Sequence, residues 1–263
     1  MSDPNSAKMK ALCVQNYGEP ADVLRLEMVS IPLPRAGQVR IRVHACGLNP
    51  ADWAVCQGFI PLPPPRGIGF DVSGTVDAVG EGVTGVSVGD LVFGVPDYIG
   101  YPTAGAAEYA VLKVWVPVPV GLDLLHAACL PMAVETATRS IDLLGLSRGQ
   151  TIMINGGGTM TGFAAVQIAL RRGAHVIATA GETYAERLHD RGARVTAYGH
   201  GMVERVRELA GGVWPVHRRG EREVGEGGPG REHQAAVRTG RRRRDESATS
   251  TVRSLWLYGP PGG

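Results

Sequence analysis

The sequence predicts an α/β chain in which a small β-barrel precedes an incomplete, doubly wound parallel sheet. Residues 9–129 alternate short apolar runs with turns rich in glycine and proline, whereas residues 130–212 alternate helical and strand patterns. Residues 151–181 combine strand, glycine turn, helix and strand in one run. With 263 residues, of which 44% are hydrophobic, the chain is long enough to bury a sizeable core.

The clearest strand of the N-terminal part runs from Gln38 to Ala45. In this run Val39, Ile41 and Val43 alternate with polar side chains, which is typical of a strand with one buried face. Glycine and proline punctuate the neighbouring segments, for example in DAVGEGVTGVSVGD. Many short strands separated by such turns predict a small barrel over residues 9–129. Residues 1–8 are mostly polar, and we expect them to be disordered.

Residues 151–181 have the order and size of a dinucleotide-binding βαβ unit. Apolar strands are expected at Thr151–Ile154 and His175–Thr179, with a helix from about residue 161 to residue 172 between them. The glycines Gly156 to Gly158 separate the first strand from the helix. Because glycine has no bulky side chain, a pyrophosphate can approach the backbone amides at the start of the helix. The segment therefore predicts a nucleotide site, and the alternative is a glycine-rich turn in another kind of parallel-sheet protein.

The glycine pattern departs from G-x-G-x-x-G at its middle position. With Gly157 as the first glycine and Gly162 as the last, the middle position is Thr159. This threonine could narrow the approach to a pyrophosphate, or its hydroxyl could contact a phosphate oxygen. The candidate cofactor-binding residues of this turn are Gly157, Gly158, Thr159, Met160, Thr161 and Gly162.

The alternation of helix and strand continues to residue 212 and then stops. Further elements are expected as a polar helix over 182–190, a short strand near 194–198 and a helix over 202–210. Residues 213–263 contain ten arginines, six acidic residues and no lysine, and they have no sustained period.

Three explanations of this Arg/Gly-rich tail stay open. It could be a basic arm whose Arg241–Arg244 run contacts nucleic acid. It could be a disordered segment that buries too little apolar surface to offset its ordering entropy. It could also come from a slipped reading frame in GC-rich coding sequence. The last two explanations are compatible with each other and are favoured.

Several stretches of residues 9–212 match the motifs of one known family. They include GIGFDVSGTVDAVGEGVTGVSVGDLVFG, LPMAVETATRSI and NGGGTMTGFAAVQIALRRGAHVIATAG. On these motifs the chain resembles the zinc-free branch of the medium-chain dehydrogenase/reductase family, the quinone-oxidoreductase and enoyl-reductase group. The resemblance implies a GroES-like barrel over 9–129 and a partial Rossmann domain over 130–212. It also implies hydride transfer from a nicotinamide cofactor to a quinone or to an activated C=C or carbonyl acceptor.

The resemblance also bears on metal use. Zinc-dependent relatives place a cysteine ligand where this chain has Asn49, and a His–Glu pair where it has Phe70 and Asp71. Neither asparagine nor phenylalanine offers the thiolate or imidazole that zinc prefers. The four cysteines of the chain also form no Cys-x-x-Cys pair. The resemblance therefore implies a protein without a metal site.

The cofactor that the resemblance implies is NADPH. NAD-specific sites hold the ribose 2′-hydroxyl with an acidic residue about 20 residues past the glycines, and this chain has Ala180 there. Tyr198 matches a tyrosine that lines the 2′-phosphate pocket of quinone oxidoreductases, and the alternative is an ordinary aromatic residue at a strand end. Against NADPH, Glu182 stands where some relatives carry a phosphate-binding lysine.

Two further residues are singled out by the resemblance. Asn49 matches a family asparagine near the nicotinamide and the substrate, and it is the predicted catalytic residue. The alternative is a turn residue before Pro50. Thr136 matches a threonine that contacts the nicotinamide, and the alternative is a helical residue with a buried hydroxyl. Asp52 is expected to be structural.

These inferences predict a cytoplasmic NADPH-dependent oxidoreductase that acts on a small-molecule acceptor. No apolar stretch approaches the ~20 residues of a membrane span, and the polar N-terminus lacks the apolar core of a signal peptide. Family members are longer, and the part without a match here commonly carries the dimer interface, so a homodimer is disfavoured. The first alternative is a catalytically impaired nucleotide-binding remnant. The second, less favoured, is a nucleic-acid-associated protein acting through the tail.

Overall fold

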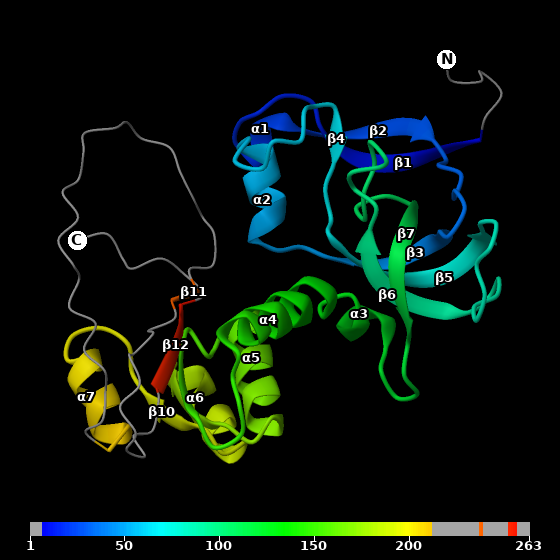
Figure 1. Cartoon of the computed structure of the whole chain (residues 1–263). Coiled ribbons are helices and arrows are strands. Elements are labelled where there is room, and N and C mark those ends of the chain that lie inside the picture. Colours follow the sequence, from blue (N-terminus) through cyan, green and yellow to red (C-terminus); the bar gives the residue numbers. More distant parts are fainter. Residues whose placement is uncertain (1–6, 212–236, 239–251, 257–263) are drawn as a thin grey trace. The chain divides into compact units, whose positions relative to one another are not determined.

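The computed structural model describes residues 7–211, 237–238 and 252–256 (Figure 1). The chain divides into two compact units, Met1–Met132 and Ala133–Gly263. Helix α4 (Pro131–Leu144) begins in the first unit and continues in the second. Among the helices of the described ranges, none is both long enough and apolar enough to cross a membrane.

The first unit is built on a closed barrel. Its four strands pair in the order β3 (Val39–Gly47), β5 (Asp71–Val79), β6 (Leu91–Pro96) and β7 (Tyr109–Pro117), and β7 returns to β3. All four pairings are antiparallel. The barrel interior consists of short aliphatic side chains, namely Val39, Ile41, Val72, Val76, Val92, Ala110 and Leu112. The predicted barrel and the alternation in its first strand are confirmed, since Val39 and Ile41 are buried while Arg42 and His44 are exposed.

A second sheet and several short helices complete this unit. The sheet has the order β2 (Leu24–Ser30), β1 (Lys8–Val14) and β4 (Arg66–Gly67). The helices are α1 (Pro20–Val23), α2 (Pro50–Cys56) and α3 (Leu124–Ala127). Strand β1 begins at Lys8, where disorder was expected, because residue 8 pairs with Ser30. Ala7 is also ordered, since its carbonyl oxygen accepts a hydrogen bond from the amide of Ile31. Residues 1–6 lie outside the described residues.

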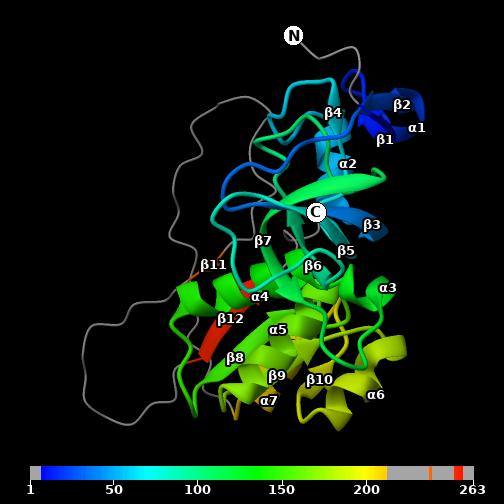
Figure 2. The same cartoon turned by 90° about the vertical axis from the view of Figure 1, so that its right-hand side faces the viewer.

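The second unit contains a mostly parallel sheet. Its order is β10 (Arg194–Thr196), β9 (His175–Thr179), β8 (Thr151–Asn155), β12 (Val252–Trp256) and β11 (Val237–Arg238). The first four strands are parallel, and β11 is antiparallel to β12 (Figure 2). The chain builds outward from β8 through β9 to β10, whereas β12 lies on the other side of β8. In a doubly wound sheet, this reversal of strand order marks the position at which ligands bind.

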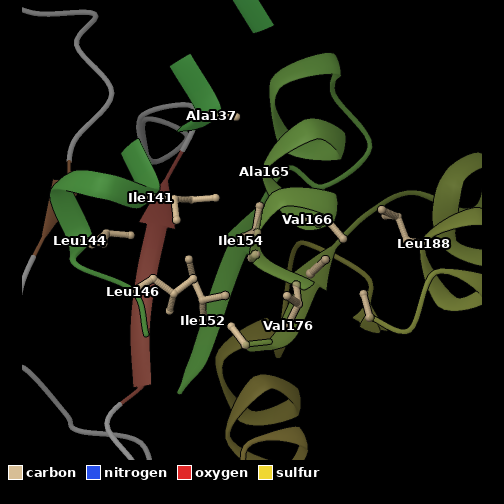
Figure 3. Close-up of a cluster of buried hydrophobic side chains, with 14 of the residues drawn as sticks. Ala137, Ile141, Leu144, Leu146, Ile152, Ile154, Ala165, Val166, Val176 and Leu188 are labelled. Carbon is tan, nitrogen blue, oxygen red and sulfur yellow. The ribbon is translucent and has the colours of Figure 1, made fainter. Parts of the chain in front are cut away.

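Helices cover both faces of this sheet. On one face, α4, α5 (Met160–Arg171) and α6 (Glu182–Asp190) pack on the side chains of β8 and β9 (Figure 3). Ile152 and Ile154 of β8 point toward Ile141 of α4 and Ala165 of α5 in this cluster. On the other face, Met153 and Ile177 pack against Val206 of α7 (Met202–Leu209). The helices and strands predicted for residues 151–210 are confirmed to within a few residues at each end.

Strands β11 and β12 differ from the expectation of a disordered tail over 213–263. Both belong to this region, and β12 pairs with β8 along its whole length, from Val252 opposite Thr151 to Trp256 opposite Asn155. The physical reason is that an unpaired edge of β8 would leave a row of backbone N–H and C=O groups without partners. The remainder of the tail, including Arg241–Arg244, lies outside the described residues.

Candidate cofactor and active site

The glycine turn leads from the end of β8 into the first turn of α5. Thr159 is the N-cap of this helix, and its Oγ1 accepts a hydrogen bond of 3.0 Å from the amide of Gly162. The same hydroxyl donates to the carbonyl oxygen of Gly156 at 2.9 Å. Since the hydroxyl has a single proton, it cannot donate to a phosphate oxygen without breaking this bond. Thr159 therefore serves here as a helix cap.

Gly162 is the position at which the motif most clearly requires glycine. A Cβ atom at this residue would lie 2.0 Å from the carbonyl oxygen of Gly156, a distance at which backbone would have to move. The missing side chain lets the start of α5 pack closely on the turn. Within the described part of the chain, the amides of Met160 and Thr161 have no hydrogen-bond acceptor, as expected for the first turn of a helix. These two N–H groups are available to an anion.

Thr179, at the end of β9, holds the glycine turn in place. Its Oγ1 accepts from the amide of Gly156 at 2.9 Å and donates to Oδ1 of Asn155 at 2.6 Å, and its carbonyl oxygen accepts from the amide of Gly157 at 2.8 Å. Thr179 is fully buried. Sequence reasoning missed this role because a threonine at a strand end is common, and its partner 23 residues away is visible only in the fold.

A surface pocket of about 530 Å³ lies at the end of β9. Its volume is within the range of small-molecule sites. It is lined by Ala180, Gly181, Glu182, Thr183, Ala185, Val195, Thr196, Ala197 and Tyr198.

Ala180 is buried, whereas Tyr198 is 66% exposed. The Oη atom of Tyr198 lies 3.4 Å from the position that a Cβ of Gly181 would take, so the ring leans toward the Ala180–Gly181 backbone. The structure therefore brings the predicted residues Ala180 and Tyr198 into one pocket. Glu182 is the one charged side chain among these lining residues.

Asn49, in the first unit, is the N-cap of α2. Its Oδ1 accepts from the amide of Ala51 at 2.9 Å, and its own amide donates to Oδ2 of Asp52 at 2.8 Å. Its Nδ2 donates to Oδ2 of Asp71 at 3.1 Å. Asn49 therefore caps α2 through its side-chain oxygen. One hydrogen of its Nδ2 is left over from these contacts.

Asp71 connects Asn49 to the start of α4. Its Oδ1 accepts from the amide of Met132 at 2.7 Å, and the side chain is 4% exposed. Burial raises the pKa of Asp71 to about 6, and the nearby carboxylate of Asp52 adds to this rise. The hydrogen bonds from Met132 and Asn49 offset part of the effect. Burial also raises the pKa of Asp52, whose Oδ1 accepts from the amide of Gly69.

Phe70 and Cys46 are neighbours of the group formed by Asn49, Asp52 and Asp71. Phe70 is buried and packs edge-to-face against Tyr98, with ring centroids 4.5 Å apart, so it is part of the hydrophobic core. Burial, together with the charges of Asp52 and Asp71, raises the pKa of Cys46 to about 12. A thiol with such a pKa is protonated at neutral pH in the metal-free protein. Within residues 7–211 and the two described strands beyond them, no three metal-ligating side chains come together.

Thr136 lies on α4 in the second unit and is half-buried. Asn49 belongs to the first unit, so the structure describes these two predicted residues separately. The glycine turn, Ala180 and Tyr198 share the second unit with Thr136.

The comparisons with known proteins agree with both units. Residues 35–121 match the model of the alcohol dehydrogenase GroES-like domain. Quinone oxidoreductase from Rattus norvegicus is 32% identical over 212 residues, which is 77% of this chain and 63% of the rat protein. A solved quinone oxidoreductase from Coxiella burnetii has a TM-score of 0.67 at 30% identity, over 76% of this chain and 65% of that chain.

A solved NAD-dependent alcohol dehydrogenase extends the match. It has a TM-score of 0.68 at 32% identity, over 78% of this chain and 68% of that chain. This chain belongs to the medium-chain dehydrogenase/reductase family. Its first unit is the GroES-like barrel of that family, and its second unit is a Rossmann-type sheet. The chain spans 63% of the length of the rat relative and 53% of the pig relative, another quinone oxidoreductase.

Proposed function

We propose that this protein is a zinc-independent, NADPH-dependent oxidoreductase that delivers hydride to a quinone or to an activated C=C or carbonyl acceptor. The observation that carries the proposal is the turn from Gly156 to Gly162. In this turn the start of α5 packs closely on the backbone of Gly156, and the amides of Met160 and Thr161 are available to an anion. The pocket at the end of β9 provides room beside this turn for the adenosine end of a dinucleotide. The relatives named quinone oxidoreductase support the class of acceptor.

The residues of the second unit fit a dinucleotide. The amides of Met160 and Thr161, at the positive end of α5, would bind the pyrophosphate. Glycine at 157, 158 and 162 lets the turn pack closely against β9, α6 and α5, because a Cβ at each position would crowd neighbouring protein atoms. Ala180 and Tyr198 would contact the adenosine ribose, and Thr136 the nicotinamide. A bound nicotinamide cofactor supplies the hydride.

Ala180 supports NADPH over NADH. A carboxylate at this position would bind the ribose 2′-hydroxyl and repel a 2′-phosphate, and alanine does neither. Tyr198 supplies a hydroxyl at the same pocket. Glu182 disfavours NADPH, because this residue lines the pocket and its negative charge would repel a 2′-phosphate. We propose that the absence of a carboxylate at the strand end outweighs this charge, since Glu182 is exposed and screened by solvent.

Zinc independence rests on the side chains at the family's ligand positions. Asn49 and Phe70 replace the cysteine and the histidine, and neither side chain offers a thiolate or an imidazole. We propose that Asn49 instead uses its remaining Nδ2 hydrogen to donate to the carbonyl oxygen of the acceptor. Asp71 orients this amide from behind through Oδ2. Such a donor stabilises negative charge that develops on the oxygen during hydride transfer.

Asn49→Ser tests this function. Serine keeps an N-cap oxygen for α2 but removes the amide donor, so the free energy of unfolding should change by less than about 1 kcal/mol. In contrast, kcat for NADPH oxidation with a quinone, followed at 340 nm in the presence of EDTA, should fall about 100-fold. The dissociation constant for NADPH should remain that of the wild type.

Undiminished turnover in the variant would contradict the role of Asn49, and inhibition of the wild type by EDTA would contradict zinc independence. Cofactor binding without turnover in the wild type would favour a nucleotide-binding remnant.

A further inference from the structure

Arg205 of α7 bonds to the wall of the pocket at the end of β9, although it was not singled out from the sequence. We infer that Arg205 positions this wall and gives the pocket its preference for an adenosine ribose that carries a 2′-phosphate. The inference rests on the nucleotide-binding function proposed above. It adds a specificity-determining residue outside the glycine turn.

Three hydrogen bonds hold the guanidinium group of Arg205. Its Nε donates to Oγ1 of Thr196, its Nη2 to the carbonyl oxygen of Ala197 and its Nη1 to the carbonyl oxygen of His200, each at 2.9 Å. Thr196 and Ala197 line the pocket, and Tyr198 is the next residue along. A single side chain therefore bonds to both ends of the segment that carries Tyr198.

This segment needs such support. Tyr198 is largely exposed, so packing contributes little to its position. The segment also contains Gly199, with φ of +90°, followed by Gly201, with φ of +72°. Glycine has the largest backbone entropy in the unfolded or mobile state, so a glycine-rich loop adopts one conformation only when specific bonds hold it. The Arg205 bonds keep Tyr198 leaning over Gly181.

The charge of Arg205 acts on the same pocket. No lysine or arginine is among its described lining residues, whereas Glu182 contributes a negative charge. A 2′-phosphate adds close to two further negative charges at neutral pH. The guanidinium carries a positive charge, and its three bonds leave two of its five N–H donors unused. It is half-buried and bonds directly to Thr196 and Ala197 of the pocket lining, so its positive charge lies next to this wall and offsets the negative charge of Glu182.

The inference is tested by calorimetric titration of the full-length chain with 2′,5′-ADP and with 5′-AMP, which differ only in the 2′-phosphate. The wild type should bind 2′,5′-ADP more tightly. Arg205→Met should weaken 2′,5′-ADP binding about tenfold, the scale of one charge-assisted contact, while changing 5′-AMP binding less than about twofold. Arg205→Lys, which keeps the charge but loses the three-bond fork, should show an intermediate loss for 2′,5′-ADP.

Arg207→Met is the matched control. Arg207 lies on the same helix two residues further, so it projects from a different face, and its guanidinium lies 3.9 Å from Glu204. This variant should bind both nucleotides as the wild type does. The melting temperature of each variant shows whether it is folded. If Arg205→Met is unfolded, the 2′,5′-ADP and 5′-AMP binding of Arg205→Lys tests the inference in its place.

Several outcomes would overturn the inference. Equal weakening of both nucleotides by the Arg205 variants would mean that the side chain only stabilises the unit. Unchanged binding, or equal wild-type affinity for the two nucleotides, would also overturn it. A wild type that binds neither nucleotide would instead contradict the proposed function itself.

Discussion

Asp71 shows how one buried carboxylate can serve both structure and chemistry. It bonds to the amide of Met132 through one oxygen and to the side chain of Asn49 through the other. In zinc-dependent relatives, by the resemblance, a glutamate at this position belongs to a metal site, whereas here the carboxylate orients an amide. Because it is buried beside Asp52, its negative form is disfavoured in the folded state.

The raised pKa of Asp71 predicts a pH dependence of stability. The folded state holds this proton up to a pKa of about 6, whereas the unfolded chain loses it near the ordinary value of 3.8. The folded state therefore binds more protons between these values, and the contribution of Asp71 to stability falls as pH rises from about 4 to about 6. Urea unfolding should show this fall, up to about 3 kcal/mol, in the wild type relative to Asp71→Asn.

Asp22→Asn is the control for this measurement. Asp22 is exposed in the first turn of α1, so its variant should keep the wild-type slope of stability against pH. A wild type and an Asp71→Asn variant with parallel pH profiles would show that Asp71 titrates alike in the folded and unfolded chains.

At the scale of elements, the turn between β8 and α5 depends on close backbone approach. Thr159 caps the helix, Thr179 holds the turn from the neighbouring strand, and Gly162 lets helix and turn meet. Each contact uses backbone groups that would otherwise stay unpaired at a helix start or a strand end.

Gly162→Ala should therefore disrupt the nucleotide site. Its Cβ would lie 2.0 Å from the carbonyl oxygen of Gly156, so α5 would have to shift. We expect a loss of about 3 kcal/mol in the free energy of unfolding, as for an overpacked core position, and loss of NADPH binding. The control is Gly18→Ala in the first unit, whose Cβ would lie 2.9 Å from a side-chain carbon of Val23 and far along the chain from the glycine turn, so this variant should still bind NADPH. An alanine at 162 that binds NADPH normally would contradict the role of this glycine.

The sequence predicted the elements of this region better than the contacts between them. Periodicity and glycine spacing located β8, α5 and β9 because burial and turn geometry are local properties. The capping role of Thr159 and the contacts of Thr179 and Arg205 depend on residues from other elements. The pairing of β12 with β8 was missed for the same reason, since a short strand in an Arg-rich segment gains its stability from a partner far along the chain.

At the scale of the whole molecule, the two units carry different parts of the proposed chemistry. The second unit has a glycine turn, available amides and a pocket, which together suit a dinucleotide. The first unit has Asn49 and Asp71, which suit a polarised acceptor. The sequence pattern suggested the glycine turn and the resemblance suggested Asn49, whereas the contacts of Asp71 come from the structure. Asn49 and Thr136 lie in separate units, so their shared role remains a prediction from the resemblance.

The most direct test of this account is a fluorescence titration of the full-length chain with NADPH and, in parallel, with NADH. The account predicts saturable binding of both, with a lower dissociation constant for NADPH, and no binding to Gly162→Ala. Circular dichroism of the same samples establishes that each chain is folded. A folded wild type that binds neither cofactor, or that binds NADH more tightly, would contradict the central claim.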